Sequence, residues 1–489
     1  MLKSPAPDAV GLDMSTGLAN KLASGIARDL EAEIVRRGWA IGESLGSEHA
    51  LQERFGVSRS VLREAVRLVE HHQVARMRRG PGGGLIICEP DAGPATRAVV
   101  IYLEYLGTTL GDLLNARLVL EPLAASLAAE RIDEAGIARL RAVLRGEEEW
   151  RPGLPTPRDE FHIALAEQSK NPVLQLFVNV LMRLTTRYAL QSRTDSATEA
   201  TEAIDRMHID HSELVEAVTA GDSARAKTLS QRHVEAVTAW LQHHHPGAPS
   251  RRRKPRPLNI EVPRGKLAEM LAATIGDDIA ASGWQVGSVF GTETALLERY
   301  RVSRAVLREA VRLLEYHSIA HMRRGPGGGL VIARPRAQAS IDTIALYLQY
   351  RDPSREDLRC VRDAIEIDNV AKVVKRCGEP EVAAFVAAHR SDVEETPGDV
   401  ADASAEEFRF HVGLAQLAGN TLLDLFLRII VELFRRHWSS TGQAPPTWAD
   451  VLAVHHAHQR IADAIEAGDE SLARYRVRRH LDAAASWWL

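Results

Sequence analysis

Hydrophobic and polar positions along the chain predict a run of short elements followed by a long helical region, and this order occurs in both halves. In the first half, apolar residues recur at helical spacing over Leu18–Gly38. A second, short helix is expected to begin after Ser47 and to end near Gly56, and Ser58 is expected to cap a third helix with one apolar face. The pattern therefore predicts three consecutive helices near the start of the chain.

A basic, glycine-rich hairpin is predicted directly after the third helix. Two short apolar runs cover residues 74–77 and 85–88, and the sequence RRGPGGG at 78–84 joins them. A loop between two strands does not fit a nucleotide-binding phosphate loop, which follows a buried strand and begins a helix. Three helices and a hairpin are the element order of a winged helix-turn-helix, whose third helix enters the major groove and whose wing approaches the DNA backbone.

Basic residues follow one face of the predicted third helix. Arg59, Arg63 and Arg67 recur every four residues, away from the apolar face. Taken alone, such a stripe is as often a solvated helix surface as a binding surface. Its combination with the cap, the turn and the wing favours DNA binding.

The chain contains a long internal repeat. Residues 46–88 align without gaps with residues 291–333 at an offset of 245, and 30 of the 43 positions are identical. Weaker similarity continues downstream, where HSELVEAVTAGD at His211 matches HQRIADAIEAGD at His458. A period of half the chain indicates a tandem duplication and not a solenoid. The second copy repeats the arginine stripe and the wing at Arg304, Arg308, Arg312, Arg323 and Arg324.

The remainder of each half is rich in Ala, Leu and Glu at helical spacing, which predicts an all-helical bundle of about six or seven helices. The predicted fold is therefore mainly α, with two winged helix-turn-helix domains and two all-α helical-bundle effector domains. A Pro- and Arg-rich linker separates the copies, and its basic run at 251–256 is more typical of a solvated spacer than of a phosphate contact. The expected domains are 15–90 (winged, copy 1), 96–243 (helical, copy 1), 244–262 (linker), 263–335 (winged, copy 2) and 340–489 (helical, copy 2).

Composition limits the function classes that remain. With 489 residues, 45% of them hydrophobic and 26% charged, the chain is expected to form several folded domains and not a disordered or fibrous protein. The net charge of -4 excludes a uniformly basic DNA-coating protein, so any nucleic-acid surface must be local. Three cysteines without metal-pair spacing, the lack of an apolar run of about 18 residues and the lack of a signal-peptide pattern favour the cytoplasm.

Histidines recur at matching positions in the two helical regions. His211 lies ten residues before Gly221 and His233 lies twelve after it, so an antiparallel helical hairpin brings both imidazoles to one level. His458 and His480 repeat this spacing around a glycine in the second copy. A single histidine of this kind is more often an ordinary core or surface residue, but the repeated spacing favours a functional set.

One further histidine precedes each pair. His162 follows Asp159 at i+3 and His411 follows Glu407 at i+4, and both spacings place a carboxylate and an imidazole on one helix face. Three histidines and a carboxylate suit a divalent metal of the zinc or nickel type. The sequence thus predicts one such site in each helical region.

The first third of each copy resembles the DNA-binding domain of the GntR family of transcription regulators. The resemblance rests on the pattern GxxLxSExxL at Gly42–Leu51, on VSRSVLREAVRLVE and on RRGPGGGLII. His49 and Thr294 depart from it, because the family commonly has arginine at that position, so the two copies need not read identical half-sites. The residues that the resemblance implies at the DNA are Ser47, Ser58, Arg59, Ser60, Arg63, Arg78, Arg79, Gly80 and Gly82, with Thr292, Ser303, Arg304, Ala305, Arg308, Arg323, Arg324, Gly325 and Gly327 in the second copy.

The helical regions resemble the FCD ligand-binding domain of FadR-type members of this family, whose metal-binding branch carries Asp-x-x-x-His and two later histidines. The ligands implied in the second copy are Glu407, His411, His458 and His480. Those implied in the first copy are His162, His211 and His233. Arg158 takes the place of the carboxylate there, so either Asp159 substitutes for it one residue along or Arg158 neutralises a ligand carboxylate instead.

The same resemblance implies small carboxylates or related metabolites as effectors. Arg117 and Arg362 are expected either to bind such an effector or to pair with Glu121 and Glu366 at i+4. Members of the family act as dimers on pseudo-palindromic DNA, so the two fused copies are expected to form an intramolecular pseudo-dimer, or a homodimer with a second chain.

These features predict a DNA-binding transcription regulator without catalytic residues, whose DNA affinity is controlled by an effector and a divalent metal in the helical domains. Two other classes of protein remain. One is a metal-dependent hydrolase whose winged domains are protein-interaction modules, because the histidine clusters also suit a catalytic metal. The other is an architectural DNA-binding protein whose helical domains bind no effector.

Overall fold

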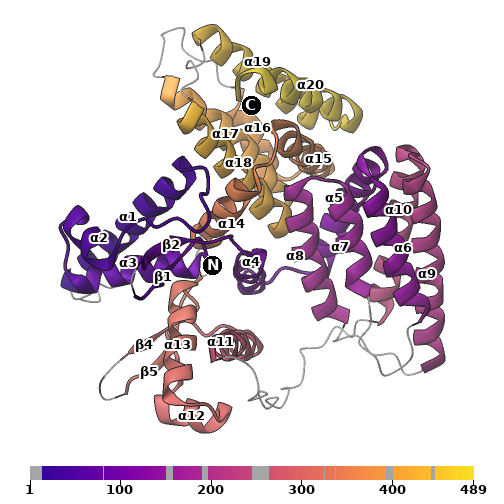
Figure 1. Ribbon diagram of the computed structural model, residues 1–489. Coiled ribbons are helices and arrows are strands. Elements are labelled where there is room, and N and C mark those ends of the chain that lie inside the picture. Colours follow the sequence, from indigo (N-terminus) through magenta and orange to yellow (C-terminus); the bar gives the residue numbers. More distant parts are fainter. Residues whose placement is uncertain are drawn as a thin grey trace. The chain divides into compact units, whose positions relative to one another are not determined.

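The computed structural model describes residues 14–80, 82–149, 158–189, 197–244, 264–323, 325, 327–335, 337–390, 400–441 and 447–488. They divide into two compact units, one up to Ala95 and one from Thr96 onward. The described elements are helices joined by short connections, with two small antiparallel sheets (Figure 1). Among these helices, none combines the length and the apolar character that crossing a bilayer requires.

The first unit contains three helices and a two-stranded sheet. Its elements are α1 (Met14–Arg36), α2 (Glu48–Phe55), α3 (Arg59–His71), β1 (Ala75–Arg78) and β2 (Gly84–Ile87). The two strands pair antiparallel, and α1 packs against α3. Leu62, Ala65 and Val69 bury one side of α3 completely, so its opposite side stays at the surface.

The same order of elements begins the second half of the chain. Its elements are α11 (Arg264–Ala281), β3 (Val289–Gly291), α12 (Glu293–Tyr300), α13 (Arg304–Tyr316), β4 (Ala320–Arg323) and β5 (Gly329–Ile332). The strands form a sheet of order β3-β5-β4. Ser44 makes the matching bridge to Ile86 in the first copy, so the same edge of the hairpin is paired in both copies.

A long helical region follows each of these two groups of short elements. The helices of the two regions correspond one to one within the described residues. The first has α4 (Ala92–Tyr105), α5 (Leu110–Arg131), α6 (Glu134–Glu148), α7 (Arg158–Gln168), α8 (Pro172–Ala189), α9 (Ala197–Thr219) and α10 (Ser223–His244). The second has α14 (Ala337–Arg351), α15 (Arg355–Val374), α16 (Pro380–Ala388), α17 (Val400–Ala418), α18 (Thr421–Thr441), α19 (Trp448–Glu466) and α20 (Glu470–Trp488). The prediction of a mainly helical chain is confirmed.

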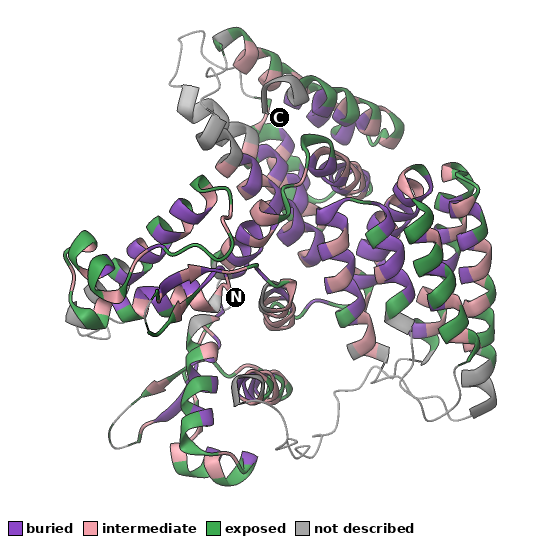
Figure 2. Ribbon diagram, viewed as in Figure 1, coloured by how far each residue is buried: buried purple, intermediate pink, exposed green. Residues whose placement is uncertain are grey.

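One helix is central to each helical region. α5 packs against α7, α8, α9 and α10, and α15 packs against α17, α18, α19 and α20. Their inward faces are buried, while the outer helices keep an exposed side (Figure 2). Arg117 and Glu121 of α5 are buried among these apolar surfaces, as are Arg362 and Glu366 of α15. The centre of each bundle therefore holds charged groups, and it is these that position the histidines described below.

The two helical regions contact each other through equivalent residues. Asn171, which caps α8, donates from Nδ2 to the carbonyl oxygen of Asp357 (2.9 Å), and Asn420, which caps α18, donates to that of Asp112 (3.0 Å). Phe177 of α8 stacks on Phe426 of α18, its own counterpart, with ring centroids 3.9 Å apart. A contact in which each residue meets the partner's equivalent has the geometry of a twofold-symmetric dimer interface.

Several boundaries differ from those predicted. α1 begins at Met14 and both strands of the first hairpin are shifted by one residue. β3 was not predicted, because it is three residues long and its register against β5 shifts between Val289 and Gly291. Residues 245–263, with the basic run at 251–256, lie outside the described part of the chain.

The turn between the second and third helices differs in backbone strain between the copies. Gly56 adopts the left-handed conformation (φ +60°) in the first copy, and Arg301 adopts it (φ +52°) in the second. A residue with a Cβ is strained there, whereas glycine is not. We expect R301G to stabilise α12 and α13 by about 0.5–1 kcal/mol.

Hydrogen exchange measured by mass spectrometry checks this prediction. Amides of residues 293–316 should exchange about twofold to fivefold more slowly in R301G than in the wild type. G56A is the reciprocal control and should speed exchange of α2 and α3. Faster exchange in R301G would show that the arginine stabilises the turn.

Candidate DNA-binding surface and histidine clusters

The arginines of α3 lie at the surface and share one carboxylate. Arg59 and Arg63 each donate from Nε to Oε1 of Glu48, over 3.0 and 2.8 Å, and their side chains are 63% and 51% exposed. Glu48 is the first residue of α2, so the turn between the helices brings it across from α3. Hydrogen bonds from Arg59 and then Arg63 lower the pKa of Glu48 to about 2, and the carboxylate is therefore charged at neutral pH.

The second copy has the same residues at ion-pair distance, but Oε1 of its glutamate makes no hydrogen bond within the described part of the chain. Nε of Arg304 lies 3.2 Å and Nε of Arg308 lies 3.8 Å from Oε1 of Glu293, the first residue of α12. Both arginine side chains are about two-thirds exposed. The equivalent of Ser60 is Ala305, so the surface of α13 lacks one hydroxyl that α3 carries.

Four of the predicted DNA-contact residues also cap helices. The hydroxyls of Ser47 and Ser58 accept hydrogen bonds from the N–H groups of Ala50 and Val61, and Thr292 and Ser303 do the same in the second copy. These caps fix where the second and third helices begin. Ser60 lies beside Ser58, with the two hydroxyl oxygens 3.0 Å apart.

The wing of the first copy is basic and exposed at its tip. Arg78, Arg79 and Gly80 are exposed, and Gly80 and Gly82 have φ of +101° and +69°, which favour glycine. In the second copy, Gly325 and Gly327 have similar angles, and Arg323 donates to the carbonyl oxygen of Gly327. Arg324 lies outside the described residues.

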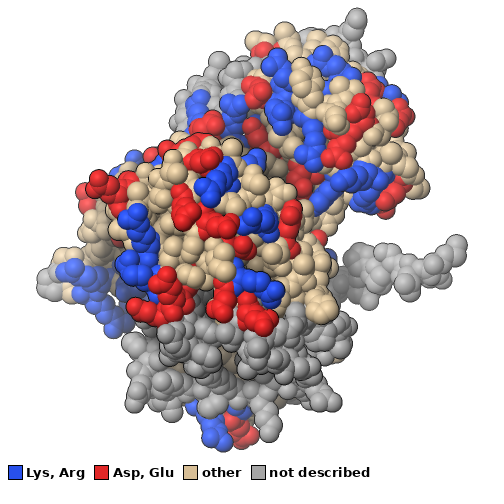
Figure 3. Space-filling model, turned by 90° about the vertical axis from the view of Figure 1, so that its right-hand side faces the viewer, with Lys and Arg blue, Asp and Glu red and all other residues tan. Residues whose placement is uncertain are grey.

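Charge is mixed on the one face of the molecule that faces the viewer in Figure 3. On the face shown in Figure 3, the described Lys and Arg side chains alternate with Asp and Glu, and neither sign forms one broad patch. The net charge of -4 agrees with a DNA-binding surface that is confined to local groups, such as the exposed arginines of α3 and α13.

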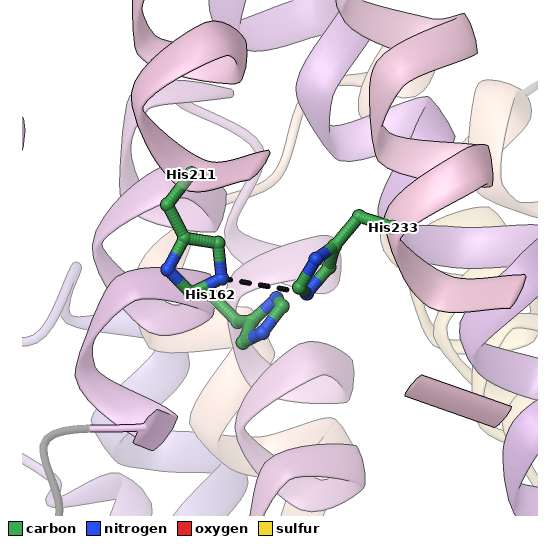
Figure 4. Close-up of side chains that lie close together, drawn as sticks. All are labelled: His162, His211 and His233. Atoms are coloured by element: carbon green, nitrogen blue, oxygen red, sulfur yellow. Dashed lines mark hydrogen bonds between the residues drawn. The ribbon is translucent and has the colours of Figure 1, made fainter. Parts of the chain in front are cut away.

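Three buried histidines converge in the first helical region. His162 of α7, His211 of α9 and His233 of α10 point toward one another, and one nitrogen of each lies within 4.8 Å of the others (Figure 4). The Nε2 atoms of His211 and His233 are 3.4 Å apart. The helical hairpin expected around Gly221 does bring these two imidazoles together, and α7 adds the third.

Each of these imidazoles contacts a carboxylate through its other nitrogen. The Nδ1 contacts are His162 with Glu121 (2.8 Å), His211 with Glu147 (2.8 Å) and His233 with Asp210 (3.2 Å). A neutral histidine that donates Nδ1–H to a carboxylate keeps a lone pair on Nε2. The three lone pairs therefore face a common point, an arrangement typical of histidines that bind a metal.

Burial and charge keep these groups in the states that such a site needs. Burial alone raises the pKa of Glu121, but the charge of Arg117 and the hydrogen bond from His162 outweigh it and hold the carboxyl ionised. Burial, with the neighbouring imidazoles, lowers the pKa of His211 well below its usual value. Burial also lowers the pKa of His233, against the opposing effect of Asp210. The two histidines are thus neutral at pH 7, the form that binds metals.

The second helical region has an equivalent cluster of His411 on α17, His458 on α19 and His480 on α20, all buried. Nε2 of His480 lies 3.1 Å from Nε2 of His411 and 3.3 Å from that of His458. Glu366 contacts Nδ1 of His411, as Glu121 contacts His162. In both copies a phenylalanine on the helix of the first histidine stacks on the second, Phe161 on His211 and Phe410 on His458.

The described carboxylate at the first histidine comes from α5 or α15, and this was not predicted. The side chains of Arg158, Asp159 and Glu407, which were expected near that histidine, lie outside the described part of the structure. Glu121 was considered only as a partner of Arg117, and that contact exists, because the two side chains are hydrogen-bonded. The i+4 spacing of Arg117 and Glu121 was visible in the sequence, but nothing local indicated that Glu121 also reaches α7.

The arginines of these central helices have different surroundings in the two copies. Arg117 is 1% exposed and pairs with Glu121. Arg362 lies 3.7 Å from Glu366 and 5.6 Å from the ring centroid of Phe434, and within the described chain its Nε makes no hydrogen bond. In the second copy the buried Nε–H of Arg362 therefore faces Glu366 without a hydrogen bond, while its Nη2 donates to Asp363.

Comparison with protein families gives two matches. The family model described as "FCD domain" matches residues 112–236 and 357–483, the two regions that hold the histidine clusters. The model "Bacterial regulatory proteins, gntR family" matches residues 22–84, which include α2, α3, β1 and the first residue of β2.

Curated proteins similar to this chain are transcriptional regulators. The HTH-type transcriptional regulator LutR of Bacillus subtilis is 31% identical over 201 residues, which are 40% of this chain and 90% of LutR. The Uxu operon regulator of Haemophilus influenzae is 26% identical over 46% of this chain and 83% of its own length. The solved structure of a Streptococcus agalactiae GntR covers 45% of the chain and 99% of its own, with 23% identity and a TM-score of 0.32.

The family matches and the regulators decide between the classes of protein that the sequence left open. They do not support the alternative of a metal-dependent hydrolase, because the similar proteins are regulators and not enzymes. The chain belongs to the GntR family of bacterial regulatory proteins, carries two FCD domains and is a DNA-binding transcription regulator.

Proposed function

We propose that the protein is a tandemly duplicated FadR-type regulator, in which each half joins a winged helix-turn-helix to an FCD effector domain. The support for a second winged domain is the repeated order of elements from α11 to β5, with the same caps and the same glutamate between two arginines. The 30 identities in 43 positions point to one duplicated ancestor for both. The proposed domains are those expected from the sequence. A regulator acts where the chromosome lies, and the cytoplasm is the compartment we propose.

In this proposal, α3 and α13 enter the major groove and the wings contact the backbone. Exposed arginines on the side of α3 opposite its buried face meet the requirement for base recognition, because arginine pairs with guanine through two N–H groups. The residues proposed at the DNA are the four helix caps, Ser60 and Ala305, the two arginine pairs and the two wing tips named above.

Arginine variants test this surface. R59A and R63A should each weaken specific binding by about 1–3 kcal/mol if the side chain reads a base, and should reduce the salt slope by about one if it contacts phosphate. R28A is a matched control, because Arg28 is an exposed arginine of α1 that donates to the carbonyl oxygen of Ser24. Fluorescence anisotropy on a duplex enriched from a random-sequence pool measures both quantities. Unchanged affinity and slope in R59A and R63A would remove α3 from the DNA surface.

The two halves of one chain form the dimer that other members of the family form from two chains. The reciprocal hydrogen bonds of Asn171 and Asn420 and the stacking of Phe177 on Phe426 support this, because each is a contact between equivalent residues. Two recognition helices related in this way fit a pseudo-palindromic operator.

Light scattering of the purified protein checks the pairing. We expect the mass of one chain in solution and one chain on one operator duplex, because the interface is satisfied within the chain. F177D should loosen the contact between the halves and raise their susceptibility to proteolysis, while Y475D, at a side chain 59% exposed outside this contact, should not. A stable dimer of chains would instead give four DNA-binding units.

Each FCD domain is proposed to bind one divalent metal of the zinc or nickel type. His162, His211 and His233 would hold it in the first copy and His411, His458 and His480 in the second, with Glu121 and Glu366 beside the first histidine. The converging Nε2 atoms, the carboxylates on Nδ1 and the burial of both clusters fit such an ion. A bound metal supplies open coordination positions for an oxygen-rich effector.

A small carboxylate is the proposed effector. Arg362 of α15 supports this in the second copy, because its Nε–H is buried and makes no hydrogen bond with the described residues. A guanidinium N–H group of this kind can donate to a carboxylate. Arg117 holds Glu121 in the first copy, so its role there is to keep that carboxylate charged. The effector acts by binding unequally to arrangements of the molecule that differ in how they present the DNA-binding helices.

Metal binding is tested by stoichiometry and thermal stability. Wild-type protein should bind two equivalents of Zn²⁺ or Ni²⁺ and should gain about 2.7 kcal/mol per site when free metal exceeds the Kd a hundredfold. H211A and H458A should each bind one equivalent, and H458A should keep wild-type DNA affinity without effector. H49A is the control, at a histidine 82% exposed on α2. Two equivalents in either cluster variant would take that histidine out of the ligand set.

A further inference from the structure

One carboxylate lies between the two exposed arginines of each recognition helix. Oε1 of Glu48 accepts from Nε of both Arg59 and Arg63, and Oε2 lies 3.5 Å from Nη2 of Arg59. The Glu48 side chain is 30% exposed and is thus more enclosed than either arginine. A negative charge on the surface that meets DNA opposes phosphate binding, so its position needs a separate physical reason.

Glu48 contacts the Nε edge of each guanidinium, which the recognition of a base does not need. A guanidinium has five N–H groups, and a guanine takes two of them. Glu48 binds Nε of Arg63, so the two Nη groups of that side chain remain for a base. A free arginine side chain samples many rotamers, and DNA binding must restrict it to one of them. A side chain that Glu48 already holds in one geometry loses less conformational entropy on binding, so the entropic cost of binding is smaller.

The same three residues meet in the second copy as an ion pair, in which Oε1 of the glutamate makes no hydrogen bond with any described residue. Glu293 lies at the first position of α12, and Nε of Arg304 and Arg308 are 3.2 and 3.8 Å from the same oxygen. Other exposed positions of these helices have diverged, as at Ser60 and Ala305 or His49 and Thr294. The glutamate and both arginines are the same in each copy.

We propose that Glu48 and Glu293 are positioning residues that determine specificity: each aligns two arginines for base contact and weakens attachment to DNA of unrelated sequence. The proposal rests on the role given above to the arginines of α3 and α13. It adds a group that acts through those arginines, with opposite effects on the two kinds of DNA binding.

Two substitutions separate the effect of the glutamate's charge from the effect of its side-chain length. E48Q/E293Q removes both charges, so binding to a scrambled duplex should strengthen and its salt slope should steepen by up to about one per head. E48D/E293D keeps the charges and the acidic first turn of α2 and α12, but the shorter side chain cannot bridge two Nε atoms. Both double variants should reduce the ratio of specific to non-specific affinity about tenfold.

The experiment uses the full chain on two duplexes of equal length, one enriched from a random pool by the wild-type protein and one scrambled. E53Q/E298Q is the matched control, because Glu53 and Glu298 are exposed on the same two helices. Circular dichroism melting verifies that every variant is folded. The single variants E48D and E48Q test the first winged domain without any assumption about the second one.

Three outcomes overturn the proposal. Equal changes in E48Q/E293Q and E53Q/E298Q would reduce Glu48 to a general surface charge. A wild-type affinity ratio in E48D/E293D would show that bridging is not needed. Loss of specific binding in R59A and R63A, with no effect of any Glu48 variant, would leave the recognition helix in place and remove only its glutamate. Wild-type behaviour of R59A and R63A would instead contradict the role proposed for α3.

Discussion

A buried carboxylate at the centre of each FCD domain is the constraint on which the site depends. Glu121 is 3% exposed, and an ionised carboxylate in such a place is strongly unfavourable unless it is paired. Arg117 lies one helical turn away on α5 and His162 approaches from α7, so two elements must be in place before the charge is balanced. The packing of α5 against α7 and the orientation of His162 are therefore set by one electrostatic requirement, which Glu366 imposes again on α15 and α17.

Local patterns predicted most of the fold because they act over a few residues. Ser58 and Ser303 mark helix starts, since a cap hydroxyl satisfies a backbone N–H three residues along. The histidine spacing around Gly221 predicted the approach of His211 and His233, because a tight helical hairpin fixes the register of its two arms. The two-copy organisation was visible in the repeat itself.

The rest of the site could not be read from spacing. Glu147 reaches His211 over 64 residues, and Glu121 reaches His162 over 41, because helix packing and not sequence distance brings them together. The contact of Glu48 with the two arginines was missed for another reason. Glu48 belongs to a motif in which the serine and the leucine already have structural roles, as the cap of α2 and as a core residue. Polar partners of this kind depend on crossing angles between helices, which a single sequence does not encode in any local pattern.

The interface between the helical regions also bears on how such a protein changes over time. In a dimer of identical chains, every substitution at the interface occurs twice, so the contact must stay complementary to itself. Here Arg131 pairs with Asp357 and Lys372 with Asn115, and the residue that matches Lys372 in the first copy is Leu127. A substitution in either half alters one side alone, so the two FCD domains are free to diverge from each other while they remain joined.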